Sequence, residues 1–148
     1  MIEIPPPDDR ITVTLHHLMA QLDDFADGLL HERFGVSYSQ FMFLAVLATL
    51  DLPDITTMGR CLGVSKAAVS KRLPSFVDAG WVELSGDPAN SRRVLLALTP
   101  AGSRLTEDAT TALDDSFTEV FTDITEVDLD QLHQQLKTVI TVLTRKGM

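Results

Sequence analysis

A single glycine between two short helical segments constrains the fold of this chain more than any other feature. The segments 55–62 and 66–79 both have the apolar spacing of amphipathic helices, and Gly63 lies between them. A glycine at this point can take the left-handed backbone conformation that ends a helix. Asp54 and Ser65 stand where a side chain can accept a hydrogen bond from the free amides at the start of each helix. The pattern predicts two helices joined by a tight turn.

Two short strands are expected directly after these helices. Gly80 ends the second helix, and the segments 81–84 and 93–98 are apolar and short enough to be strands. Residues 86–91 between them are mostly turn-forming types, which predicts a hairpin with a polar loop. Two helices around a tight turn, followed by a hairpin, make a winged helix-turn-helix.

Four more helices are predicted from apolar residues that recur at three- and four-residue steps. The first runs from Ile11 to about Gly35 and the second, capped by Ser37, from Tyr38 to Leu50. The other two are a helix that opens at Pro100 and a last helix that opens at Thr125. The helix over 38–50 is apolar on almost every side and is expected to be buried. The fold class is therefore mainly α with a small β-wing.

Apolar stripes such as those of the terminal helices are more often core within one chain, but two lobes this small rarely bury so many apolar residues alone. They favour an interface with a second copy of the chain. The organisation that follows has four parts. These are an extended leader (1–10), an N-terminal dimerisation helix (11–35), a winged helix-turn-helix lobe (36–99) and C-terminal dimerisation helices (100–148).

The second helix of the pair has side chains suited to a DNA groove. The apolar residues of this helix can face the core, while its other faces are mostly small or cationic; the apolar ones are Val69, Leu73, Phe76 and Val77. A helix fits the major groove, small side chains let its backbone approach the DNA, and cations contact phosphates or guanine edges. The candidate DNA-binding residues on this helix are Ser65, Lys66, Ala67, Ala68, Ser70, Lys71 and Arg72.

The distribution of charge supports an anionic partner although the total does not. The chain has a formal net charge of −9. Residues 56–99, however, carry six basic against three acidic side chains, a net +3. An anionic molecule would be attracted to this segment and repelled from both ends of the chain.

Four motifs, in this order and spacing, resemble the MarR (multiple antibiotic resistance regulator) family. They are Leu62-Gly-Val-Ser-Lys-Ala-Ala-Val-Ser-Lys71, Ala79-Gly-Trp-Val-Glu83, Asp87-Pro-Ala-Asn-Ser-Arg-Arg93 and Leu98-Thr-Pro-Ala-Gly102. The helix order also matches, so the resemblance spans nearly all of the chain after Asp9. It implies a triangular homodimer that binds double-stranded DNA at a pseudo-palindromic operator, and it favours a repressor of nearby genes.

The resemblance also assigns roles to the wing and to a ligand crevice. It implies that Arg92, near the wing tip, enters or borders the minor groove, with Asn90 and Arg93 beside it. In the family, small-molecule effectors often occupy the crevice between the dimerisation helices and the DNA-binding lobe. His16 and Phe41 are the candidate pocket residues here.

Two positions depart from the family pattern. The family usually has an aspartate at Asn90, so Asn90 can accept a hydrogen bond from Arg92 but supplies no charge to hold it. Pro74 lies inside the predicted recognition helix, where it removes the hydrogen bond to the Ser70 carbonyl and costs about 3 kcal/mol in an ordinary helix. A kink is expected at Pro74.

Two other function classes stay open. One is a winged-helix module that binds protein partners and not DNA, as the acidic total suggests. The other is a metal or peroxide sensor on the same fold. Against the sensor, Cys61 is expected to pack in the core as a small apolar side chain. The adjacent His16 and His17 point about 100° apart on a helix, and no metal-ligand cluster is visible.

Several classes are disfavoured by what the sequence lacks. There is no glycine-rich phosphate loop and no nucleophile elbow, so neither an enzyme nor a cofactor is expected. No apolar run reaches the roughly 18 residues of a membrane span. A lone cysteine and the absence of a visible secretory signal favour the reducing cytoplasm.

Overall fold

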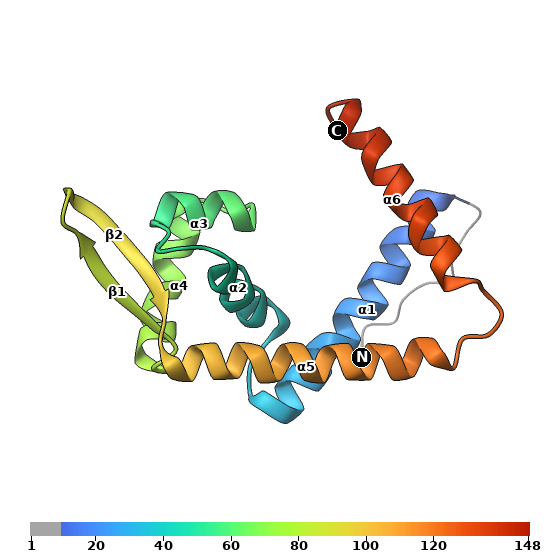
Figure 1. The fold of residues 1–148 in the computed structure, drawn as a ribbon, viewed down its shortest axis with the longest axis horizontal. Coiled ribbons are helices and arrows are strands. Elements are labelled where there is room, and N and C mark those ends of the chain that lie inside the picture. The colour runs from blue at the N-terminus through green and yellow to red at the C-terminus, as the bar shows by residue number, and fades with distance from the viewer. Residues whose placement is uncertain (1–9) are drawn as a thin grey trace. The chain divides into compact units, whose positions relative to one another are not determined.

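The computed structural model describes residues 10–148, which form six helices and one two-stranded antiparallel sheet (Figure 1). The elements are α1 (Ile11–Phe34), α2 (Tyr38–Thr49), α3 (Ile55–Leu62), α4 (Lys66–Asp78), β1 (Val82–Asp87), β2 (Asn90–Leu98), α5 (Pro100–Thr122) and α6 (Leu129–Arg145). The mainly helical fold with a β-wing is confirmed. The leader predicted over 1–10 falls almost wholly on residues 1–9, outside the described residues, and stays a prediction.

The chain divides into two compact units, Met1–Thr111 and Ala112–Met148. The boundary falls inside α5, so this helix begins in the first unit and ends in the second. The first unit holds the helix-turn-helix and the hairpin.

The core of the first unit gathers side chains from α2, α3, α4 and the sheet. Its buried members are Phe43, Leu44, Leu47, Met58, Val69, Leu73, Phe76, Val82 and Leu96. The rings of Phe43 on α2 and Phe76 on α4 stack with centroids 4.5 Å apart. Because each element contributes to one cluster, the burial of these side chains holds α4 and the hairpin on a common support.

The predicted helix caps are confirmed. Asp54 accepts a hydrogen bond from the Thr57 amide at 2.8 Å, and Ser65 accepts one from the Ala68 amide at 3.1 Å. Gly63 takes the left-handed conformation, with φ of 70°, and ends α3. Local sequence therefore sets both ends of the helix-turn-helix.

The hairpin is longer than predicted. The segment expected to be a loop over 86–91 is mostly strand, and only Pro88 and Ala89 lie between β1 and β2. The register shifts at a bulge between Gly86 and Asp87, which lets pairing continue to the turn. Asp87 Oδ1 accepts a hydrogen bond from the Ala89 amide and closes that turn.

The start predicted for the last helix was wrong. α6 begins at Leu129 and not at Thr125, because Asp128 accepts a hydrogen bond from the Gln131 amide and caps the helix there.

Candidate nucleic-acid interface

The helix α4 turns its apolar residues inward and its small and cationic residues outward. Val69, Leu73 and Phe76 are buried. Lys66, Ala67, Ser70 and Lys71 are exposed and Ala68 is half-buried. The division of faces predicted from the sequence is therefore present, apart from Val77, which is 40% exposed.

The N-terminal end of α4 suits an anion. Ser65 caps the helix through the Ala68 amide, and Lys66 is the first helical residue. The unpaired backbone amides and the positive end of the helix dipole favour a negative group at this end. A phosphate or a base edge approaching here would meet Lys66 and Ala67 before any acidic side chain of α4.

The glycine turn brings α3 and α4 close together. The Val64 amide donates to the Gly59 carbonyl at 2.9 Å. A Cβ on Gly59 would lie only 2.8 Å from the Val64 carbonyl oxygen, so no larger residue fits without a shift. Gly59 was not singled out by the sequence analysis. A glycine inside a helix, where it costs about 1 kcal/mol, is the signal that could have found it.

Arg72, a predicted DNA contact, folds back onto the protein. Its Nη2 donates to the Ser39 carbonyl at 2.9 Å and to the Ser39 hydroxyl at 3.1 Å. The guanidinium lies 5.2 Å from the centroid of the Phe43 ring and 5.7 Å from that of Phe76. Burial lowers the pKa of Arg72. These contacts tie α4 to the start of α2 and leave little of the side chain for DNA.

The helix α4 continues through Pro74 to Asp78. Pro74 and Ser70, whose carbonyl loses its helical partner, are both exposed, so water can satisfy that carbonyl. Pro74 therefore does not end the recognition helix, and a bend at this position stays a prediction.

At the wing, Arg92 is exposed and Asn90 bonds its backbone. Asn90 Oδ1 accepts from the Arg92 amide at 3.1 Å, which fixes the chain after the turn rather than the guanidinium. Among the described residues no carboxylate forms a salt bridge with Arg92. The Arg92 guanidinium is thus available to a partner.

Arg93 is held by two carboxylates. Its Nε lies 3.0 Å from Asp54 Oδ2 and its Nη1 lies 2.9 Å from Asp87 Oδ2. The amide and hydroxyl of Thr57, and then Arg93 itself, lower the pKa of Asp54 to about 2. Hydrogen bonding to Asp54 in turn raises the pKa of Arg93. Arg93 was predicted to contact DNA beside Arg92, and its ion pairs with Asp54 and Asp87 were not predicted.

The expectation for Cys61 was wrong, because Cys61 is exposed. The inward face of α3 carries Met58 and Gly59, with Ile55 and Leu62 half-buried beside them, and Cys61 lies off it. In residues 10–148 no group of three potential metal ligands comes together.

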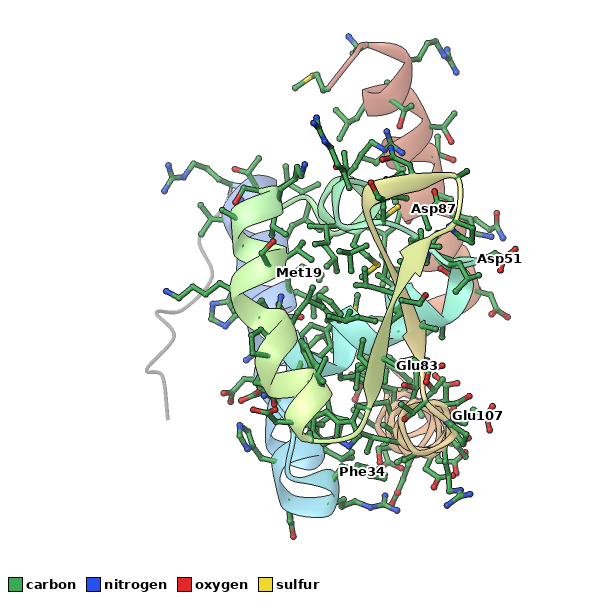
Figure 2. The ribbon with its side chains drawn as sticks, turned by 90° about the vertical axis from the view of Figure 1, so that its left-hand side faces the viewer. Met19, Phe34, Asp51, Glu83, Asp87 and Glu107 are labelled. Carbon is green, nitrogen blue, oxygen red and sulfur yellow. The ribbon has the colours of Figure 1, made fainter. Side chains whose placement is uncertain are left out.

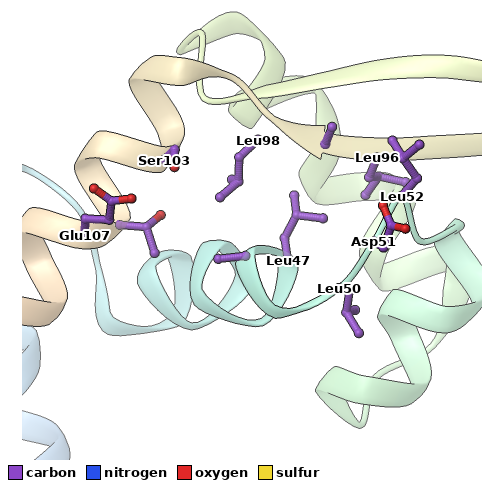
Figure 3. A pocket seen from close by; sticks show the side chains of 11 residues that line it. Leu47, Leu50, Asp51, Leu52, Leu96, Leu98, Ser103 and Glu107 are labelled. Atoms are coloured by element: carbon purple, nitrogen blue, oxygen red, sulfur yellow. The ribbon is translucent and has the colours of Figure 1, made fainter.

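A cavity of about 360 Å³ opens between the end of α2, β2 and the first turns of α5 (Figure 3). Leu47, Leu96 and Leu98 form its walls, with Asp51 toward one side and Glu107 toward the other. Neither candidate pocket residue lines it: His16 is exposed on α1, and Phe41 is buried on α2. Leu52 at its rim has a φ of 43°, which is rare for leucine.

These features define a winged helix-turn-helix, with α3 and α4 as the helix pair and β1–β2 as the wing. Figure 2 shows Asp87 near the turn of the hairpin that forms the wing. The family model that matches the chain is that of the MarR family, over residues 34–93, which cover α2 to the wing. The match covers 60 of the 148 residues, and the chain resembles the MarR family over that segment.

Solved structures share the fold over nearly the whole chain. A cysteine-to-serine mutant of E. coli MarR is 22% identical with a TM-score of 0.80, over 91% of this chain and 99% of that one. MepR of Staphylococcus aureus, a regulator of the multidrug efflux pump MepA, is 19% identical with a TM-score of 0.76, over 90% and 98%. The transcriptional repressor CouR, bound to a 23-mer DNA duplex, is 16% identical with a TM-score of 0.79, over 91% and 93%. No curated protein matches the chain in sequence.

These matches bear on the class of protein. The family and the structural neighbours are transcription regulators and not enzymes, as the sequence analysis expected. In the described part of the chain, no helix is both long and apolar enough to cross a membrane.

Proposed function

We propose that this chain is a homodimeric repressor that inserts α4 into the major groove of a pseudo-palindromic operator and Arg92 into the adjacent minor groove. The observation that carries the proposal is the outward face of α4, where Lys66, Ala67, Ser70 and Lys71 are all exposed at the cationic end of the helix. The DNA-bound CouR, which shares the fold, supports the same use of it.

Dimerisation is supported by apolar side chains that one chain leaves in water. On α1, Ile11 is 71% and Met19 is 53% exposed. On α6, Ile140 is 63% exposed, and the helix has no buried residue at all. A chain of this size rarely leaves whole helices uncovered, and a second copy of the chain would bury both faces. We therefore assign α1 and α5–α6 to the dimer interface.

The third part of the proposal is that a small molecule releases the protein from its operator DNA. The cavity between α2, β2 and α5 is the candidate effector site, because β2 belongs to the wing and α5 continues into the second unit. A ligand there would favour one spacing of the two lobes over others, and only one spacing matches major grooves roughly 34 Å apart.

The test is fluorescence anisotropy with a labelled duplex from the protein's own promoter region, over a range of salt concentrations. Arg92→Ala should weaken binding to all sequences and lower the salt slope by about 0.9. Lys66→Ala should reduce the preference for operator over random DNA. Asp78→Asn, an exposed change at the C-terminal end of α4 and away from Lys66, is the control. Salt-independent or absent binding would favour a module that binds protein partners.

The oligomeric state is measured separately. Light scattering coupled to gel filtration should give a dimer for the wild type and a monomer for Ile140→Glu. Thr138→Glu, an exposed change on the opposite side of the same helix, serves as the control for added charge. A monomeric wild-type chain would overturn the dimer.

A further inference from the structure

We infer that Arg93 is a positioning residue that fastens the wing to the start of α3, and that it does not contact phosphate. The inference rests on the proposed DNA-binding function, and it separates two neighbouring arginines that look equivalent in the sequence. Arg92 would contact the DNA, while Arg93 would fix the position of the wing that carries Arg92.

The first support is that one guanidinium joins two elements distant in sequence. Asp54 caps α3, Asp87 precedes the hairpin turn, and Arg93 bonds both at 3.0 and 2.9 Å. The side chains of Asp54 and Asp87 are only 21% and 12% exposed, and that of Arg93 is 45% exposed. The planar guanidinium can bridge two carboxylates at once, which a lysine ammonium does less well.

The second support is that each carboxylate is itself held by backbone. The Oδ1 of Asp54 accepts from the Thr57 amide at 2.8 Å, and the Oδ1 of Asp87 accepts from the Ala89 amide at 2.9 Å. Arg93 thus links the first turn of α3 to the hairpin turn through two fixed groups. The Leu96 amide also donates to the Pro53 carbonyl at 2.9 Å, so the segment before α3 lies along β2.

The third support is electrostatic. Two ionised carboxylates around one guanidinium leave a local net negative charge, which repels a phosphate. Arg93 would have to give up two charge-assisted hydrogen bonds to reach DNA.

The test compares Arg93→Ala, Asp87→Ala and the double variant, with Arg92→Ala as the matched control. We expect Arg93→Ala and Asp87→Ala each to weaken operator binding about tenfold without changing the salt slope. We expect the double variant to be no weaker than either single one. Arg92→Ala should lower the slope by about 0.9. If Arg93 contacted phosphate instead, Arg93→Ala alone would lower the salt slope of operator binding. Asp87→Ala would then tighten operator binding, because it removes a negative charge near the DNA.

Amide hydrogen exchange tests the fastening without DNA. Exchange at Ala89 and Arg92 should speed up severalfold in Arg93→Ala, and less in Arg93→Lys, which keeps one ion pair. Unchanged exchange would overturn the inference even if the protein binds DNA as proposed. Faster exchange in a protein that binds no DNA would instead overturn the proposed function and leave the fastening standing.

Discussion

The Nη2 atom of Arg72 donates a hydrogen bond to the backbone carbonyl of Ser39 at 2.9 Å. This bond joins the middle of the recognition helix α4 to the first turn of α2, and the Arg72 guanidinium lies over the rings of Phe43 and Phe76. Arg72 was predicted from the sequence to contact DNA, but its contacts instead hold α4 against α2 within the protein.

Removal of Arg72 should destabilise the protein more than removal of its neighbour. Arg72→Ala loses two hydrogen bonds and two cation–π contacts, so the free energy of unfolding should fall by about 2 kcal/mol. Lys71→Ala removes an exposed side chain and should change it by less than about 0.5 kcal/mol. Urea denaturation measures both. Equal effects of the two substitutions would contradict the anchoring role of Arg72.

Two helical glycines should respond oppositely to alanine. A Cβ on Gly102 would collide with the Trp81 carbonyl oxygen, whereas one on Gly28 meets nothing within 4 Å. Gly102→Ala should lower the melting temperature because the start of α5 must move away from Trp81. Gly28→Ala should raise the free energy of unfolding by up to about 1 kcal/mol through helix propensity alone. Thermal unfolding of both variants gives the comparison, and a stabilised Gly102→Ala would contradict the close approach.

Interactions between residues close together in the chain could be predicted from the sequence, and those between distant residues could not. The caps by Asp54 and Ser65 and the turn at Gly63 depend on residues within three positions, so local pattern was enough. Ser39 lies 33 residues from Arg72, and Asp54, one of the two partners of Arg93, lies 39 residues from it along the chain. No local pattern contains those pairs, and both cations were therefore grouped with the free ones. The burial predicted for Cys61 failed because the inward face of α3 carries Met58 and Gly59, and Cys61 lies off that face.

Pro74 should lower the free energy of unfolding, and α4 should form without it. Because α4 continues past Pro74, alanine there can restore the amide that bonds the Ser70 carbonyl. Pro74→Ala should raise the free energy of unfolding by about 1–2 kcal/mol, less than the full penalty because that carbonyl is exposed and water can bond to it. Chemical denaturation gives the value, with Ser75→Ala as the neighbouring control. A destabilised variant would mean that α4 needs the shape that Pro74 imposes.

The ionisation of Asp54 should make the protein less stable in acid. The pKa of Asp54 is about 2 in the folded chain against an ordinary value of 3.8. A folded-state pKa below the unfolded one contributes stability that is complete above about pH 4 and is lost as the pH falls toward 2. Asp54→Asn should remove this part of the pH dependence while it keeps a capping side chain. Melting temperatures between pH 6 and 2.5 test this, and identical pH profiles would contradict it.

The cavity between α2, β2 and α5, proposed as the effector site, should prefer cations. Asp51 and Glu107 line it together with leucines, and no basic side chain does. Each exposed carboxylate near a bound charge contributes about 1 kcal/mol, so a cation should bind at least about fivefold tighter than an anion of the same shape. Benzamidine and benzoate are such a pair, and NMR shifts of the Leu47 and Leu98 methyl groups report their binding. Asp51→Asn with Glu107→Gln should abolish the difference between the two. Tighter binding of benzoate would mean that groups outside this cavity, such as those of a second chain, determine its charge preference.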